Sequence, residues 1–268
     1  MKNLKLLIYD LLPPLIIKVL KKKKYGWFGN YSSWDEALQN STGYDKIEIL
    51  NRVKESILKV KNGEAVFERD SVLFYKEDYD WPFLGCLLWI ASVHQNKLKL
   101  IDFGGSLGSV YFQCKKFLSH LEILDWNVVE QKHFVDVGKN LFEDHHLKFY
   151  YDIAECIGDK DKKPLVLVLS SVLQYLQDPY LMIQQFINYG FDYIIIDKTG
   201  LSNLSKDIIT IQKVPEFIYS ASYPCWLFSK EKLLSYFSSK YEIIVNFDGG
   251  FQINSDTKYE GILLKKII

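Results

Sequence analysis

The stretch Leu98-Lys99-Leu100-Ile101-Asp102-Phe103-Gly104-Gly105-Ser106-Leu107-Gly108 decides the fold of this chain. Residues 98–103 predict a strand that ends at Gly104 and Gly105, and residues 109–119 predict the helix that follows. Glycines let a backbone adopt positive φ and approach a ligand closely. The stretch therefore predicts a strand, a glycine loop and a helix, an arrangement that binds ligands beyond the carboxyl end of the strand.

The alternation of strand and helix continues through the rest of the chain. Further strands are predicted at residues 126–130, 148–151, 165–169 and 192–197, and further helices at 179–189 and 230–239. Strands that are apolar on both faces and alternate with helices indicate a parallel, doubly wound sheet. Two late strands, 241–245 and 259–264, are separated by Asp248-Gly249-Gly250 and predict an antiparallel edge hairpin. The fold class is therefore α/β, with a Rossmann-like domain over residues 96–268.

The first part of the chain predicts a different organisation, a helical extension or lid over residues 1–95. Ser33 precedes an acidic helical turn as an N-cap, residues 45–61 show helical spacing, and Pro82 suits the first turn of a helix at 81–93. Two aromatic segments, 25–44 and 215–226, are expected to form a lid. Residues 1–24 are apolar and end in four lysines, which predicts either packing on the domain or a peripheral contact with a membrane surface.

Composition excludes several classes of protein. The chain has 268 residues, of which 48% are hydrophobic, and 33 basic residues balance 33 acidic ones. A nucleic-acid binder normally carries a basic excess, so no nucleic-acid partner is expected. The four cysteines lie far apart and without zinc spacing, which favours reduced thiols in a cytoplasmic protein. The localisation expected is the cytoplasm, with the inner face of the membrane as the alternative.

The glycine loop departs from two common nucleotide-binding motifs. Ser106 and Ser109 stand where the dinucleotide fingerprint has its second and third glycines, and no lysine follows to make a P-loop. The spacing Asp102-x-Gly104-x-x-x-Gly108 instead resembles the first motif of class I S-adenosylmethionine-dependent methyltransferases, with Ser106 in place of the usual middle glycine. Gly105 belongs to the same loop.

Polar residues at the ends of the next strands fit an adenosine ligand. Glu130 ends the second strand, where a carboxylate can accept two hydrogen bonds from a ribose diol, or can remain a solvated acid. Asp152 follows the third strand and could bind the exocyclic amine of adenine or cap the next helix. Ser170 follows the fourth strand, where a methyl donor and its acceptor would meet.

A wider resemblance covers nearly the whole chain. It rests on segments that occur in order, at residues 25–29, 33–37, 43–45, 102–108, 126–131, 170–176, 215, 218–219 and 221–224. Together they resemble a family of bacterial methyltransferases associated with lipopolysaccharide and capsule biosynthesis. The resemblance implies S-adenosylmethionine as the donor and a surface-glycan precursor, or a substituent on one, as the acceptor.

Methylation of a hydroxyl requires a base, and the sequence offers several candidates. Asp197 ends a central strand and Tyr175 follows the fourth strand, so these two are the catalytic residues expected; His145 and His146 are the alternatives. Tyr219, Tyr223 and Trp226 are expected to contact the acceptor or to pack in the core.

No metal requirement is expected, because no acid lies between Ser170 and Asp178. Two other functions remain open: another nucleotide-sugar or dinucleotide enzyme, and a non-catalytic nucleotide-binding protein of the same pathway.

Overall fold

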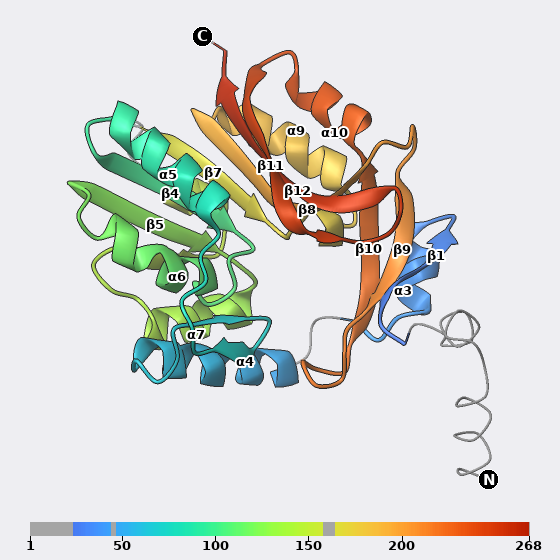
Figure 1. The fold of residues 1–268 in the computed structure, drawn as a ribbon, viewed down its shortest axis with the longest axis horizontal. Coiled ribbons are helices and arrows are strands. Elements are labelled where there is room, and N and C mark those ends of the chain that lie inside the picture. The colour runs from blue at the N-terminus through green and yellow to red at the C-terminus, as the bar shows by residue number, and fades with distance from the viewer. Residues whose placement is uncertain (1–23, 44–46, 158–163, 268) are drawn as a thin grey trace.

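A mixed β-sheet covered by helices on both faces forms the centre of the protein (Figure 1). The computed structural model describes residues 24–43, 47–157 and 164–267. Its strands are β1 (Gly26–Tyr31), β2 (Phe67–Arg69), β3 (Val72–Phe74), β4 (Lys97–Phe103), β5 (Ile123–Val129), β6 (Leu147–Tyr150), β7 (Leu165–Ser170), β8 (Tyr193–Ser202), β9 (Ile208–Lys213), β10 (Ser222–Ser229), β11 (Tyr241–Gln252) and β12 (Thr257–Lys266). Its helices are α3 (Trp34–Gln39), α4 (Ile47–Lys61), α5 (Trp81–Val93), α6 (Ser109–Leu118), α7 (Lys132–Leu141), α8 (Ile153–Ile157), the 3₁₀ turn η1 (Leu173–Tyr175), α9 (Pro179–Tyr189) and α10 (Lys230–Phe237).

The parallel part of the sheet has the order β6-β5-β4-β7-β8. The central strand β4 pairs with β5 on one side and with β7 on the other, both in parallel. The chain reverses its direction of winding between these two neighbours, so the carboxyl end of β4 lies at the switch point where open α/β sheets bind ligands. The predicted doubly wound sheet is confirmed.

Two-sided burial explains why these strands are continuously apolar. In β7, Val166 and Val168 face a core shared with α5, α6 and α7, whereas Leu167 and Leu169 face a second core shared with α9 and α10. Successive side chains of a strand point to opposite faces, so each strand supplies both cores in turn. A strand with one polar face could not occupy this position.

The antiparallel edge hairpin is confirmed, but its turn lies elsewhere than the sequence predicts. β12 runs antiparallel between β8 and β11. Gly249 and Gly250 lie inside β11, where the register with β12 shifts, and residues 253–256 connect the two strands. A Cβ on Gly249 would lie 2.7 Å from the backbone of Tyr259, so this glycine permits close approach of the two strands rather than a turn.

The sheet splits beyond the end of β7. Since β12 occupies one edge of β8 over most of its length, β7 and β10 share the other edge: β7 pairs with residues 193–197 and β10 with Leu201 and Ser202. β10 also pairs antiparallel with β9, and β9 in turn pairs antiparallel with β1. The gap between β7 and β10 holds η1, and the candidate site described below opens there.

The amino-terminal segment contains strands as well as the expected helices. Ser33 caps α3, its Oγ accepting from the Glu36 amide at 3.2 Å, and Pro82 lies in the first turn of α5, as predicted. However, β1 joins the main sheet and β2 and β3 form a hairpin. Apolar side chains of α4 and α5 pack into the same core as β4, and the division at residue 95 stays a prediction.

The predicted membrane contact involves residues 1–24. Of these, residues 1–23 lie outside the described residues. Within the described residues no helix has the length and apolar character needed to cross a membrane. Of the second lid segment, 215–226, residues 222–226 form the start of β10.

A substitution at Gly138 can test how tightly α7 packs on the sheet. Alanine is the better helix former by about 1 kcal/mol, yet a Cβ here would lie 2.4–2.6 Å from three atoms of the buried Phe149 ring. We therefore expect Gly138→Ala to reduce the free energy of unfolding by about 1–3 kcal/mol, the scale of overpacking. Urea denaturation measures this, with the exposed Asn140→Ala as the control on the same helix; equal stability of both variants would contradict the packing.

Candidate functional site

The loop after β4 has the conformation that its glycines predict. Gly104 has φ +75°, Gly108 has φ +86°, and Ser106, in the place of the usual middle glycine, has φ +53°. Positive φ at a non-glycine residue is strained and is often found at functional sites. Gly104, Gly105 and Ser106 line a cavity described below, whereas Gly108 caps α6 and packs against Leu147.

The side chain of Asp102 packs against the backbone of this loop at Gly105. Its carboxylate is buried and accepts a hydrogen bond from Trp126 Nε1 at 3.0 Å. A Cβ on Gly105 would lie 2.5 Å from this carboxylate, so only glycine fits above it. Burial raises the pKa of the Asp102 carboxyl to about 7, with the hydrogen bond from Trp126 opposing the rise and the charge of Glu130 adding to it.

Glu130 follows β5 and contacts the loop directly. Its carboxylate accepts hydrogen bonds from the Gln131 amide at 2.7 Å and from the Ser106 amide at 3.3 Å. Burial raises the pKa of Glu130, although these two amides oppose the shift. The side chain lines the cavity at the position predicted for a ribose diol.

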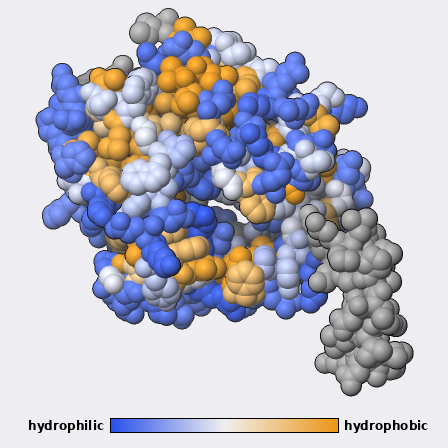
Figure 2. All heavy atoms as spheres, in the orientation of Figure 1, coloured by the Kyte–Doolittle hydropathy of each residue, from blue (hydrophilic) through white to orange (hydrophobic). Residues whose placement is uncertain are grey.

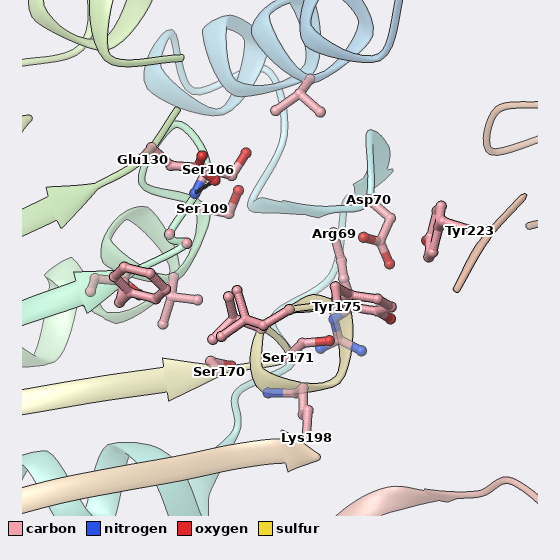
Figure 3. A pocket seen from close by; sticks show the side chains of 18 of the residues that line it. Arg69, Asp70, Ser106, Ser109, Glu130, Ser170, Ser171, Tyr175, Lys198 and Tyr223 are labelled. Carbon is pink, nitrogen blue, oxygen red and sulfur yellow. Dashed lines mark hydrogen bonds between the residues drawn. The ribbon is translucent and has the colours of Figure 1, made fainter. Parts of the chain in front are cut away.

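One cavity of about 880 Å³ connects the glycine loop with the gap between β7 and β10. This is within the range of small-molecule sites and large enough for more than one ligand group. Figure 2 shows it as a hollow near the middle of the molecular surface. Figure 3 shows Glu130, Ser106 and Ser109 at one end of the cavity, and Tyr175, Lys198 and Tyr223 at the other.

A network of charged groups begins with Lys198 at the floor of the cavity and continues behind it. Lys198 Nζ donates to Asp197 Oδ2 at 2.9 Å and also to Asp80, the N-cap of α5. Although burial would lower the pKa of Lys198, these two carboxylates raise it, so the lysine stays charged. Ser170 Oγ donates to Asp197 at 2.8 Å. Ser171 and Lys198 both have positive φ, so backbone strain gathers here as it does at the glycine loop.

Asp197 does not reach the cavity. Its side chain is 1% exposed and lies behind Ser170 and Lys198, which do line the cavity. A general base must meet the proton that it removes, directly or through one water. The structure therefore gives Asp197 the geometry of a positioning residue, not that of the base expected from the sequence.

Tyrosines form the wall near η1. Tyr175 donates to Gln212 Oε1 at 2.8 Å, and its ring meets the ring of Tyr223 edge-on at 5.2 Å. Tyr219 and Tyr259 line the same region. Burial raises the pKa of Tyr175, Tyr219 and Tyr259, so these phenols are neutral hydrogen-bonding groups rather than bases.

The β2–β3 hairpin supplies three site residues that the sequence prediction missed. Glu68, Arg69 and Asp70 all line the cavity, and Figure 3 shows the Asp70 carboxylate pointing toward Tyr223. Asp70 and Ser71 form the two-residue turn with positive φ. The strands are only three residues long, so they lack the apolar alternation that would have revealed them.

Several predicted residues lie outside the cavity lining. Asp152 caps α8 by accepting from the Glu155 amide at 3.0 Å, the second of its two expected roles. Trp226 stacks on Trp34 and donates to the Leu176 carbonyl at 3.0 Å, which is a packing role. His146 forms a hydrogen bond with the Leu124 carbonyl. His145 and His146 precede β6, so they lie at the amino-terminal ends of the parallel strands, whereas the glycine loop lies at the carboxyl ends. Neither histidine is placed to act as the base.

Within the described parts of the chain, no group of three or more His, Cys, Asp or Glu side chains is arranged to hold a metal. The lack of a metal requirement stays a prediction, to be checked by treatment with a chelator.

The order β6-β5-β4-β7-β8-β12-β11, with only β12 antiparallel to its neighbours, defines the class I methyltransferase-like α/β fold. No protein-family model matches the chain, and no curated protein matches it in sequence.

Among solved structures, the chain is similar to the N-terminal domain of EvdMO1, crystallised in the presence of SAH and D-fucose (TM-score 0.48, 12% identity, 84% of this chain and 98% of that one). It is similar to the 1,6-didemethyltoxoflavin-N1-methyltransferase of Burkholderia thailandensis (TM-score 0.47, 8% identity, 92% and 98%). It is also similar to the [4+2]-cyclase SpnF (TM-score 0.48, 10% identity, 91% and 100%). We take no residue role from these similarities.

Asp102 gives the folded protein a measurable pH dependence. The folded carboxyl keeps its proton up to about pH 7, whereas the unfolded one loses it near 3.8. Between these values the folded state binds more protons, so the free energy of unfolding falls as the pH rises. We expect Asp102→Asn to reduce this fall by about 1–3 kcal/mol between about pH 5 and about pH 8. Denaturation at several pH values checks this, and a variant with the wild-type slope would disprove the assignment.

Proposed function

We propose that this protein is an S-adenosylmethionine-dependent methyltransferase. The observation that carries the proposal is the shared cavity: a strained glycine loop after β4 and the Glu130 carboxylate after β5 face the same space, which continues to a tyrosine wall. The first two features suit the amino-acid portion and the ribose of the donor. The third leaves room for an acceptor beside them.

The charge of the cavity supports a cationic donor. Among the described residues that line it, Glu68, Asp70, Asp102 and Glu130 are acidic and Arg69 and Lys198 are basic, and Lys198 is already paired with two carboxylates. The pKa values of these four carboxyls are raised, chiefly by desolvation, which disfavours their charged forms. A ligand that carries both a sulfonium and an ammonium group would supply positive charge that favours those forms.

The chain's own residues then have simple tasks. When bound, S-adenosylmethionine supplies an activated methyl group, so the protein has to orient an acceptor atom in line with it and exclude water. Glu130 and the glycine loop hold the donor end. Ser170, Ser171 and the charged Lys198 form the floor between the two ends.

We propose Asp70 as the base for a hydroxyl acceptor. Among the described residues, its carboxylate lies on the tyrosine side of the cavity and points toward Tyr223 (Figure 3). Asp197 acts indirectly, by holding Ser170 Oγ and Lys198 Nζ in place. Tyr175 is fixed by Gln212 and shapes the wall.

The acceptor that fits this wall is a sugar. Tyr219 and Tyr223 are largely buried, yet both line the cavity, and each combines an aromatic ring with a hydroxyl group, which suits the apolar face and the hydroxyl groups of a sugar ring. Together with the sequence resemblance, this supports O-methylation of a surface-glycan precursor in capsule or lipopolysaccharide biosynthesis. Mass analysis of surface glycans from a deletion strain, looking for the loss of one methylene unit, tests the acceptor class.

Calorimetry with S-adenosylmethionine and with NAD tests the donor. Binding of S-adenosylmethionine alone is expected; binding of NAD alone would favour a dinucleotide enzyme. Donor binding without turnover on any sugar acceptor would instead indicate a non-catalytic binding protein.

Glu130 is expected to contribute strongly to donor affinity. Glu130→Ala removes both hydrogen bonds to the ribose and should weaken the binding of S-adenosylhomocysteine by about 1–3 kcal/mol, the scale of charged hydrogen bonds. Calorimetry measures the dissociation constant. Glu122→Ala, an exposed acid paired with Lys97, is the control and should bind as the wild type does. Unchanged affinity in a folded Glu130→Ala protein would show that the ribose lies elsewhere.

Substitution of Asp70 and of Asp197 should reduce kcat to different extents. Asp70→Asn is expected to reduce kcat by about a hundredfold or more, the contribution of a general base, with donor affinity intact. Asp197→Asn keeps its shape and should reduce kcat less. Initial rates with the acceptor identified from the glycans measure both effects. A larger loss in Asp197→Asn than in Asp70→Asn would reverse the two roles.

A further inference from the structure

A buried acid on the β2–β3 hairpin contacts the start of α6. Glu68 is 4% exposed, yet it lines the cavity. Its carboxylate accepts a hydrogen bond from the Ser109 hydroxyl, at the first residue of α6, and another from the Ser71 amide at 2.9 Å. The hairpin therefore places a carboxylate at the start of α6, where the glycine loop ends.

The hairpin is built to hold this position. Phe67 and Phe74 stack with ring centroids 4.5 Å apart and nearly parallel planes. A two-residue turn with positive φ at both positions connects the strands, which is the favoured geometry for a tight hairpin. Ser56 in α4 donates to the Ser71 carbonyl at 2.8 Å and ties the turn to the body of the protein.

Among the described residues, the cation whose charge acts on Glu68 is the neighbouring Arg69, which lowers the pKa of the Glu68 carboxyl only as the last and smallest of several effects. Across the described ranges 24–43, 47–157 and 164–267, no lysine or arginine forms an ion pair with it. Arg69, the nearest cation along the hairpin, instead lies over the rings of Phe67 and Phe74. Burial raises the pKa of the Glu68 carboxyl to about 7, although the hydrogen bonds from Ser109 and Ser71 oppose the rise. A carboxylate in this position is stabilised when a cation binds beside it.

We propose that Glu68 binds the α-ammonium group of the methionine portion of the donor, and so acts as a clamp from the β2–β3 hairpin. This inference rests on the proposed function, because the glycine loop must hold that portion of the ligand. The α-ammonium is the cation that a donor on this loop would present at the start of α6. The helix N-terminus favours the anionic form of Glu68, which is the form that the clamp requires.

A cycle of four dissociation constants tests the clamp. The wild type and Glu68→Gln are each titrated with S-adenosylhomocysteine and with its analogue that lacks the α-amino group. We expect the wild type to prefer the amino compound by about tenfold or more, and the variant to bind the two compounds within about threefold of each other. Glu64→Gln, an exposed acid in the same segment, should keep the wild-type preference.

The outcomes distinguish this inference from the proposed function. If the wild type binds neither compound, the proposed function itself fails. If the wild type binds both equally, or if Glu68→Gln keeps the wild-type preference, the clamp is wrong while the donor site stands. Weaker binding of both compounds by the same factor would assign Glu68 a purely structural role. The wild-type comparison does not depend on whether the variant folds.

Discussion

The packing of Gly105 on the buried carboxylate of Asp102 is the constraint on which the rest of the site depends. The backbone of the loop lies so close to this carboxylate that a single added carbon would overlap it. Trp126 Nε1 fixes the carboxylate from the neighbouring strand β5. The loop, the central strand and its neighbour therefore form one unit, and Glu130 at the end of β5 is held at hydrogen-bonding distance from Ser106.

The acidic character of the cavity follows from this arrangement. Asp102 and Glu130 come from the sheet, Glu68 and Asp70 from a hairpin that packs against α4 and α6, and burial raises the pKa values of Asp102, Glu130 and Glu68. Holding several unpaired carboxyls out of water is unfavourable unless a cation joins them. At the floor of the site the protein supplies its own cation, Lys198, between Asp80 and Asp197.

The split in the sheet separates two kinds of surface. The parallel strands end in a loop of glycine and serine, where the backbone itself faces the ligand. The antiparallel strands β9 and β10 bring tyrosine and glutamine side chains across the gap, and η1 carries Tyr175 between them. A rigid backbone cradle suits an invariant ligand, whereas a wall of side chains is free to vary with its partner. This division agrees with one donor and a separately selected acceptor.

The sequence by itself determined the parallel sheet, the glycine loop after β4 and the acid after β5, because each depends on residues close together in the chain. Periodicity and turn chemistry are local, so they can be read without knowing what packs against them. Only the tertiary structure decided which side chains share the cavity. Glu68 meets Ser109 across 41 positions of sequence, and the hairpin that carries it is too short to show a pattern. Asp197 ends a strand as the sequence predicts, but the lysine and serine around it, not its position in the chain, bury it behind the cavity wall.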